Sequence, residues 1–368
     1  MWILSGQAGI IHWHRIRKVM RIAIDAMGGD FAPQALVAGA IKAAKMLPQI
    51  SKIFLVGRQE TIEREYKHFR QIPDKIEICH ASDIIGMDEA PVTAIRRKKD
   101  SSVSKAIDLV KSAKADAMLS AGNTGAVVAS AKLKLRTLKG IERPAIATVM
   151  PTPIKPFILI DAGANTDCSA RLLYQFAVMG GVYSREILHQ PNPLVGLMSV
   201  GTEDTKGNEI TKEAFQLLER SQLNFKGNIE GRDLYKGEID VAVCDGFVGN
   251  VILKTSESVA YAIGTWIKSE FRQSIIRKMG ALLLTGALRV MRHRFDPDTY
   301  GGALLLGVNG VCIICHGASS AHAIYHAIRV ACDSVTHNIN HLIVRMLVSS
   351  SPNSSMANSA TDNTGDII

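Results

Sequence analysis

The chain has 368 residues, with 43 Lys and Arg against 34 Asp and Glu, so its formal charge is +9. Apolar residues make up 47% and charged residues 21%, which excludes a disordered, collagen-like or disulfide-stapled chain and predicts roughly two domains or one large globular unit. The basic excess favours acidic partners by long-range attraction, and nucleic acid, an anionic membrane, an acidic carrier protein and phosphate-bearing substrates all fit it.

Residues 1–19 differ from the body that follows. They hold a weak apolar stretch whose charges come after it, the reverse of a secretory signal, so we expect an atypical, appended extension. The body, residues 20–345, begins with a strand over 21–25. A glycine turn follows this strand, and Pro33 then opens a helix that runs to about residue 47, because proline fits the first helical turn.

Apolar runs and helical patterns alternate along the rest of the body. Further strands are predicted at 53–56, 117–119, 146–150, 157–160, 195–200, 241–244 and 311–314. Helices are predicted between them at 58–69, 103–113, 125–136, 168–180, 208–221, 248–271 and 319–346. This alternation predicts an α/β fold with a largely parallel, doubly wound sheet and helices on both faces. Residues 346–368 are polar, which predicts a disordered tail.

Small polar clusters follow six of the predicted strands. In a parallel sheet the carboxyl ends of the strands collect ligand-binding residues, so we expect these clusters to converge on one edge as the rim of an active site. Taken singly, each cluster is more often only a turn before a helix. The residues of the rim that we expect to bind or position a ligand are Asp25, Gly28, Gly29, Asp30, Asn123, Thr124, Asp161, Asn165, Asp245, Asn250 and Ser319.

Several common motifs are missing from the chain. No G-x-G-x-x-G follows a strand, and Leu253 stands where a phosphate-binding loop needs the glycine before Lys254. These absences disfavour ATP or NAD chemistry, and we expect no cofactor. A pair of cysteines and two pairs of histidines have spacings that a metal site could use, but no carboxylate motif accompanies them and we expect no metal. These pairs are Cys312/Cys315, His322/His326 and His337/His341.

What remains suits the binding of anions, because glycine turns at helix N-termini point free N–H groups at a negative ligand. Residues 96–102 place four cations beside two hydroxyls. This run is either a solvated turn or a clamp for phosphate or a phosphopantetheine arm, formed by Arg97, Lys98 and Ser102. Lys206 and Lys254 lie beside other clusters. His316 is the best acid–base candidate, since its side chain titrates near neutrality; its alternative role is to shape its own loop.

Residues 272–295 combine apolar side chains at helical spacing with flanking cations. A basic amphipathic pair of helices binds an anionic membrane interface, whereas the alternative is a packed or dimer-forming helical hairpin. The apolar positions are Ile275, Ile276, Met279, Leu282, Leu283, Leu284, Leu288 and Met291, and the cations are Arg272, Arg277, Lys278, Arg289, Arg292 and Arg294.

Together these stretches resemble the phosphate acyltransferases of bacterial phospholipid synthesis, the PlsX family. The resemblance covers residues 21–345 in order. It is carried by the segments 24–30, 96–102, 120–125, 161–165, 195–203, 206–209, 227–233, 244–255, 300–302 and 316–317. The chain departs from the family pattern at Phe31, Leu304 and Ala318, and the last of these moves any hydroxyl role to Ser319 or Ser320.

The resemblance implies an acyltransferase that converts acyl-ACP and inorganic phosphate to acyl phosphate and ACP. It also implies a fold similar to the isocitrate and isopropylmalate dehydrogenases and phosphotransacetylase, and a homodimer. The product would feed a membrane glycerol-3-phosphate acyltransferase. We therefore expect a cytoplasmic protein that associates peripherally with the inner face of the membrane through residues 272–295 and binds no nucleic acid.

The same resemblance suggests roles for the rim. His316 and Lys254 would serve proton transfer or charge balance, and Asn123 would hold the phosphate or the oxyanion. Asp245 would organise the rim with the other acidic and amide side chains. Two other functions compete: a nucleotide-dependent oxidoreductase on the same fold, and a non-catalytic scaffold on the membrane surface.

Overall fold

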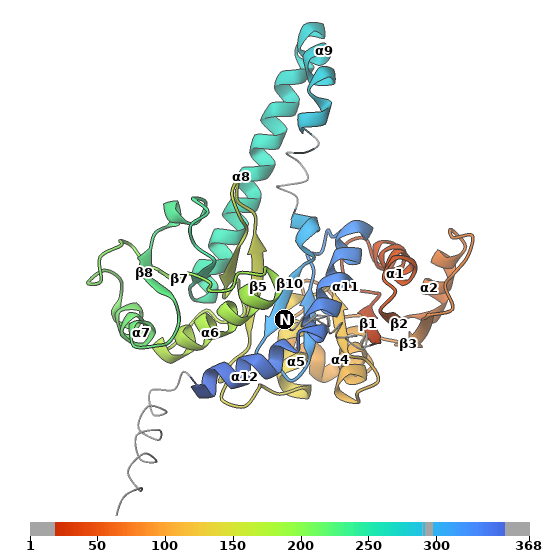
Figure 1. The fold of residues 1–368 in the computed structure, drawn as a ribbon. Coiled ribbons are helices and arrows are strands. Elements are labelled where there is room, and N and C mark those ends of the chain that lie inside the picture. Colours follow the sequence, from red (N-terminus) through yellow and green to blue (C-terminus); the bar gives the residue numbers. More distant parts are fainter. Residues whose placement is uncertain (1–18, 289, 291–296, 350–368) are drawn as a thin grey trace, which may run out of the picture.

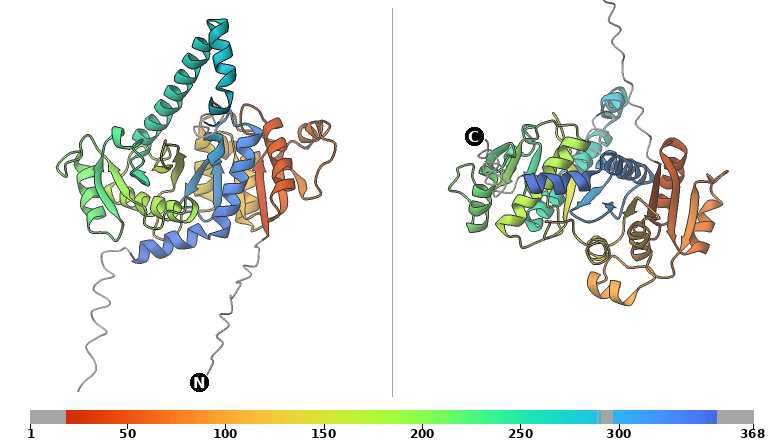
Figure 2. Two further views of the ribbon diagram at one scale, coloured as in Figure 1. Left: turned by 45° about the horizontal axis from the view of Figure 1, so that its top comes forward. Right: turned by 60° about the horizontal axis from the view of Figure 1, so that its bottom comes forward.

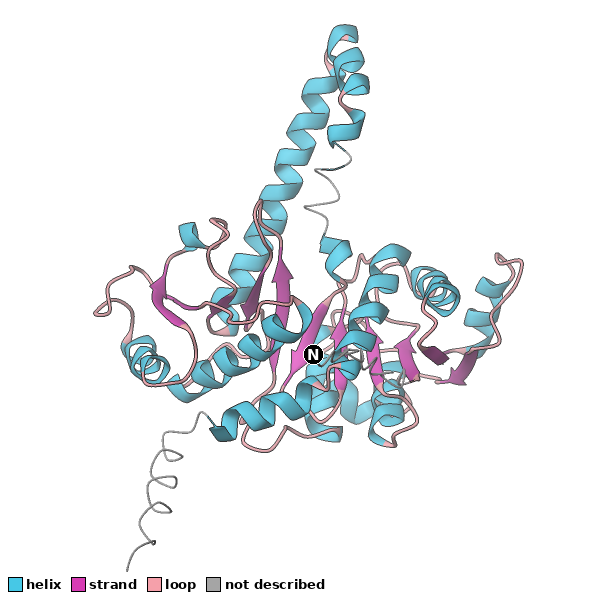
Figure 3. Ribbon diagram, in the orientation of Figure 1, coloured by secondary structure: helices cyan, strands magenta, loops and turns pink. Residues whose placement is uncertain are grey.

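The structure is a computed structural model that describes residues 19–288, 290 and 297–349. In this part of the chain eleven strands form one sheet, in the order β3-β2-β1-β4-β11-β10-β5-β6-β9-β7-β8 (Figures 1 and 3). The strands are β1 (Met20–Asp25), β2 (Ile50–Gly57), β3 (Ile76–His80), β4 (Ala117–Ser120), β5 (Ala145–Met150), β6 (Phe157–Ile160), β7 (Val195–Met198), β8 (Phe225–Ile229), β9 (Val241–Val243), β10 (Ala303–Leu306) and β11 (Val311–Ile314).

Helices cover both faces of the sheet, as the sequence predicts (Figure 2). One face and its apolar cluster carry α1 (Gln34–Met46), α2 (Gln59–Tyr66), α6 (Ala170–Ile187), α7 (Glu209–Glu219), α11 (Ala321–Thr336) and α12 (Ile339–Ser349). The other face carries α3 (Pro91–Arg97), α4 (Ser102–Lys111), α5 (Thr124–Lys134) and the start of α8 (Gly246–Arg272). Short 3-10 turns lie at Gly231–Asp233 and Pro297–Tyr300.

The sheet is mostly parallel, but its direction reverses in the middle. β10 pairs antiparallel with both β11 and β5, and β5 pairs antiparallel with β6. All other strand pairs are parallel, so β6, β9, β7 and β8 run opposite to β1, β2, β3, β4 and β11. The expectation of six strand ends on one edge is therefore wrong. The ends of β1, β4 and β11 meet at one edge, and those of β6, β7 and β9 meet at the opposite edge.

Two predicted boundaries also change. The helix expected over 319–346 is interrupted: α11 ends at Thr336, Asn338 has a positive φ of 50°, and α12 begins at Ile339. His337 and His341 therefore do not share one helix. α12 continues to Ser349 because Ile343 and Leu347 are buried against the core, so the body extends beyond residue 345. The expected extension and tail otherwise lie outside the described residues.

α8 projects from the body, and α9 (Ile275–Leu283) folds back along it to form a hairpin (Figure 1, top). With 27 residues, α8 is about 40 Å long. α9 has no buried residue. None of the helices in the described ranges is long and apolar enough to cross a membrane. Of residues 272–295, Ile275–Leu283 form the exposed α9, one arm of this hairpin, and residues 289 and 291–296 lie outside the described residues. The membrane and dimer roles of this segment stay predictions.

The first turn of α8 touches the backbone that follows β6. The N–H of Gly246 donates to the carbonyl of Asn165 at 2.6 Å. A Cβ atom on Gly249 would lie 1.9 Å from the carbonyl oxygen of Asp161, whereas a Cβ on Gly264, further along α8, would meet nothing within 4 Å. The close approach of α8 to the loop after β6 therefore requires glycine at position 249.

We predict that Gly249→Ala lowers the free energy of unfolding by about 2–3 kcal/mol, because the methyl group forces the helix away from the carbonyl of Asp161. Gly264→Ala, the matched control in the same helix, should raise it by about 0.5–1 kcal/mol through helix propensity alone. Urea denaturation of both variants measures the two changes. Equal shifts would contradict the proposed contact.

Candidate functional site

Three loops meet at the edge where β1, β4 and β11 end. The N–H of Asp30 donates to the carbonyl of Gly317 at 2.8 Å, and the N–H of Cys315 donates to the carbonyl of Ser120 at 2.8 Å. A Cβ on Gly28 would lie 2.6 Å from the nitrogen of Gly122. We call these loops, residues 25–30, 120–124 and 315–320, the first cluster.

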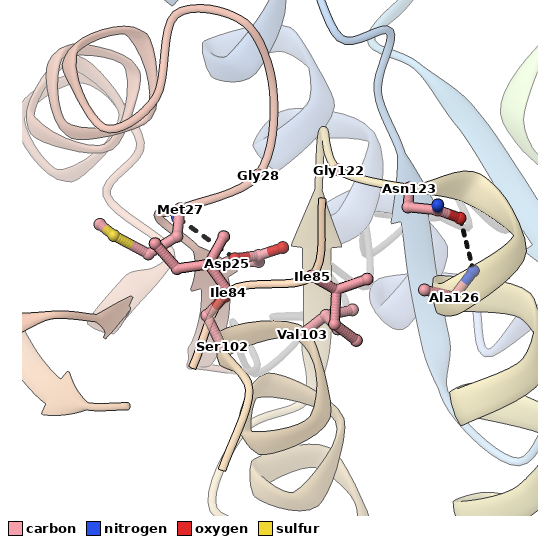
Figure 4. A pocket seen from close by; sticks show the side chains of 10 residues that line it. All are labelled: Asp25, Met27, Gly28, Ile84, Ile85, Ser102, Val103, Gly122, Asn123 and Ala126. Atoms are coloured by element: carbon pink, nitrogen blue, oxygen red, sulfur yellow. Dashed lines mark hydrogen bonds between the residues drawn. The ribbon is translucent and has the colours of Figure 1, made fainter. Parts of the chain in front are cut away.

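Asp25 lies at the centre of the first cluster and is only 3% exposed. Its carboxylate accepts hydrogen bonds from the Ser120 hydroxyl at 2.7 Å and the Met27 N–H at 3.2 Å. Burial raises the pKa of Asp25, while these bonds and one from the Ser102 hydroxyl oppose the rise. Figure 4 shows Asp25, Met27 and Ser102 among the residues that line a small cavity. Its volume of about 10 Å³ is room for about one water molecule.

The side-chain amide of Asn123 holds the first cluster to a neighbouring loop. Its Oδ1 accepts the N–H of Ala126 at 3.0 Å and so caps α5. Its Nδ2 donates to the carbonyls of Gly86, Met87 and Glu89 at 3.0–3.2 Å. These bonds occupy the amide, so Asn123 positions backbone groups and does not offer its own N–H to an oxyanion.

The 84–89 loop is a part of the site that sequence reasoning missed. Lys98 fixes it, since its Nζ lies 2.7 Å from the carbonyl oxygen of Ile84 and 2.5 Å from Oε1 of Glu89. This ion pair lowers the pKa of Glu89. Arg97 is exposed at the end of α3, and Ser102 is buried beside Asp25. The acidic residues of the Met87–Glu89 stretch, which comes just before the four cations of residues 96–99, could have indicated this ion pair.

His316 is exposed at the end of the loop after β11. Its Nδ1 accepts the N–H of Ala318 at 3.1 Å, which places the proton of the neutral ring on Nε2. The ring therefore shapes its own loop and also presents one donor. Ser319 is buried, and Ser320 caps α11 by accepting the N–H of Ala323.

The residues predicted after β6 and β9 form a second cluster at the opposite edge, made of the loop 161–165 and the first turns of α8. Asp161 is fully buried, and Asn165 links its carboxylate to the carbonyl of Pro144. Asp245 caps α8 by accepting the N–H of Val248 at 2.9 Å. Lys254 is exposed and pairs with Glu257 at 2.8 Å.

The structure does not bring all the predicted residues together. Asn250, in the first turn of α8, is exposed opposite Gly163, and Lys206 is exposed in the loop after β7. Thr124 is exposed at the first position of α5, within the first cluster. The two clusters do share one apolar layer, because Leu253 of α8 packs on the same core cluster as Val127 of α5.

The first cluster has the features of an anion site. The N-termini of α5 and α11 both begin there, and Gly29, with a φ of 103°, turns the loop of β1 toward them. Unpaired N–H groups in the first turn of a helix and the helix dipole both favour a phosphate oxygen. In the described ranges, no three His, Cys, Asp or Glu side chains gather as a metal site.

The fold is similar to that of solved phosphotransacetylases. A phosphotransacetylase from Streptococcus pyogenes matches 86% of this chain and 94% of its own with a TM-score of 0.58 and 18% identity. The phosphotransacetylase EutD from Staphylococcus aureus matches the same shares with a TM-score of 0.55 and 16% identity. At such identities the likeness concerns the fold, and it confirms the predicted α/β class.

Sequence relatives identify the family. The profile of a family described as "Fatty acid synthesis protein" matches residues 20–342. A phosphate acyltransferase from Heliobacterium modesticaldum is 49% identical over 87% of this chain and 95% of its own, and one from Trichlorobacter lovleyi is 46% identical over 89% and 94%. The chain belongs to the phosphate acyltransferase family, so it is an acyltransferase of lipid synthesis, as its resemblance to that family implies.

The buried carboxyl of Asp25 predicts a pH-dependent stability. Its folded pKa is raised above the unfolded value, so its contribution is present below about pH 4 and is lost as the pH rises through the folded pKa. Asp25→Asn, which mimics the protonated form, should exceed the wild type in unfolding free energy by about 1–3 kcal/mol at pH 8 and match it near pH 4. The exposed Asp30→Asn is the control. A constant difference between pH 4 and 8 would contradict this assignment.

Proposed function

We propose that this enzyme transfers a fatty acyl group from the thioester of an acyl carrier protein to inorganic phosphate. The observation that carries the proposal is the first cluster, where glycine turns and the N-termini of α5 and α11 gather at one edge of the sheet. Such N–H groups bind phosphate. The names of the relatives, phosphate acyltransferases, support both the acyl transfer and the phosphate.

Phosphate is itself the nucleophile in this reaction. One of its oxygens attacks the carbonyl carbon of the thioester, the C–S bond breaks, and the carrier leaves as a thiolate that takes up a proton. The protein therefore has to align the two substrates, stabilise the developing oxyanion and manage one proton. No Ser–His or Cys–His pair is needed for this chemistry.

Each part of the first cluster receives a role in this proposal. Thr124 and the first N–H groups of α5 hold phosphate, Gly28 and Gly29 let the backbone approach it, and Asn123 fixes this arrangement through the 84–89 loop. The Nε2–H of His316 hydrogen-bonds the phosphate, and the proton that the phosphate loses on acylation passes to the leaving thiolate.

The second cluster has a supporting role in the proposal. Asp161 and Asn165 organise its loop, and Asp245 orients the first turn of α8. Lys254 lies on α8, away from the N-terminus of α5 where phosphate is proposed to bind. It would neutralise negative charge on the reacting groups if the bound substrate extends from α5 to α8. The competing oxidoreductase and scaffold functions are not favoured, because the relatives are named acyltransferases.

The test is to incubate the protein with long-chain acyl-ACP and phosphate, and to follow thiol release and acyl phosphate trapped by hydroxylamine. We predict phosphate-dependent release without added nucleotide or metal, and a loss of about tenfold or more in kcat for His316→Ala. Lys254→Ala reports on the second cluster, and a normal kcat removes Lys254 from the site. Absence of release from folded protein and competent acyl-ACP would overturn the proposed function.

We also propose that the hairpin of α8 and α9 serves a homodimer and an anionic membrane surface. The large exposed apolar side chains of α8 include Val259, Ile263 and Trp266, which suit a second copy of the chain. α9 exposes Ile276 and Leu283 by more than 80%, beside Arg277 and Lys278. A cytoplasmic enzyme attached to the membrane in this way would deliver acyl phosphate to a membrane glycerol-3-phosphate acyltransferase.

The membrane part of this proposal predicts the effect of placing charge on α9. The double variant Ile276→Glu, Leu283→Glu should lower co-sedimentation with phosphatidylglycerol vesicles by about tenfold or more, because two carboxylates replace buried apolar contacts in the interface. Val200→Glu, an equally exposed apolar position outside the hairpin, should leave binding unchanged. Equal vesicle binding by all three proteins would exclude α9 as the membrane contact.

A further inference from the structure

The positive charge of this chain is concentrated in one segment. Residues 91–140 contain eleven Lys and Arg residues and three Asp residues, which gives a net charge of eight against +9 for the whole chain. This segment forms α3, α4, β4, α5 and the turn after α5. Because α5 packs against both α3 and α4, the three helices form one continuous surface, which we call the basic face.

The few acidic groups of the basic face are already neutralised by ion pairs. Asp100 pairs with Lys105 at 2.9 Å, Asp108 with Lys134 at 2.6 Å, and Asp116 with Arg21 at 3.0 Å. Lys98 pairs with Glu89. The other cations are exposed, and none of the three aspartates pairs with them. These exposed cations are Arg96, Arg97, Lys99, Lys111, Lys114, Lys132, Arg136 and Lys139.

A groove lies on the basic face at the C-terminal ends of α4 and α5. It has a volume of about 360 Å³ and lies between the ends of α4 and α5, beside Asn309. Val110 and the 64%-exposed Leu133 give it apolar walls, and Lys111 and Arg136 give it charge. Such a mixture matches a helix that carries acidic side chains around a few apolar ones, since interfaces combine an apolar centre with a charged rim.

The basic face leads directly to the first cluster. α5 begins at Thr124 in that cluster and ends at Lys134 beside the groove, a length of about 16 Å. α3, which carries Arg97, lies against the start of α5, where a Cβ on Gly125 would meet Pro91 at 2.5 Å. A partner seated on the basic face would therefore lie within one helix length of the phosphate site.

We infer that the basic face is the docking surface for the acidic carrier protein that brings the acyl group, an inference that rests on the proposed function. Charge complementarity and the path along α5 favour this partner over a membrane. The large exposed apolar side chains of the face are only Val92 and Leu133 in the part of the chain described, whereas the hairpin carries many and projects from the opposite end of the molecule (Figure 1). Residues 91–140 also hold no aromatic residue to stack on nucleic acid bases.

The experiment compares two charge-matched double variants of the full chain. Lys111→Glu with Lys132→Glu reverses two exposed cations of the basic face, and Lys45→Glu with Lys67→Glu reverses two exposed cations on α1 and after α2. We expect the first pair to raise the KM for acyl-ACP about tenfold, with kcat and the KM for phosphate unchanged. The control pair should stay within about twofold of the wild type.

The same enzymes are assayed with acyl-CoA, a thioester without a carrier protein, and at rising salt. Activity on acyl-CoA should be equal in all three, and the rise of KM for acyl-ACP with salt should be weaker in the basic-face variant. An unchanged KM for acyl-ACP, or an equal rise in the control pair, would overturn the inference. If the basic-face variant keeps its KM for acyl-ACP but no longer binds anionic vesicles or duplex DNA, the basic face binds a membrane or nucleic acid and the inference is wrong. Failure of the wild type to use acyl-ACP would instead refute the proposed function.

Discussion

The carboxylate of Asp161 links the loop after β6 to the neighbouring strand β5, which runs in the opposite direction. It is fully buried at the point where the sheet reverses, and its two oxygens accept N–H groups from Ile146 on β5 and from Gly163, Ala164 and Asn165 in its own loop, at 2.7–3.1 Å. Burial raises the pKa of Asp161, and these donors oppose that rise by stabilising the ionised form. Removing the carboxylate would leave several buried N–H groups unpaired.

Much of the arrangement follows from this anchor. The loop after β6 is fixed to β5, and α8 can begin against its backbone only because Gly246 and Gly249 lack side chains. The second cluster thus lies at the edge of the sheet opposite to that of the first cluster. The reversal gives the protein two sets of strand ends, and in one of them, the first cluster, the N-termini of α5 and α11 meet the glycine turn after β1.

The sequence predicted the strands that are continuously buried, such as β6 and β11, because such strands are uninterrupted apolar runs. It missed β3, where Glu77 interrupts the run at the sheet edge, and β8, which contains Gly227 and Asn228. It also missed β10. An apolar pattern carries no information on strand direction, so the reversal at β10, β5 and β6 could not be predicted.

The sequence indicated which polar residues lie at the candidate site, but not how they are arranged there. The polar residues after strands were found, but their hydrogen bonds were not, since Asn123 bonds to carbonyls 34–37 residues away. Lys98 was expected to bind phosphate or a phosphopantetheine arm, and in the structure it pairs with Glu89, a contact that was not predicted from the sequence. In this site most polar side chains hold loops in place, and the groups left to meet an anion are largely backbone N–H groups.

The amide of Asn123 has a consequence for the ageing of the protein. The side-chain amide of an asparagine is slowly hydrolysed: water is added, ammonia leaves and a carboxylate remains. At this position the change would place negative oxygens against three carbonyl oxygens that now accept hydrogen bonds from Nδ2. The cap of α5 would survive, because a carboxylate still accepts the N–H of Ala126, while the 84–89 loop would be repelled. The chemical lifetime of a single amide thus limits how long the two loops stay joined.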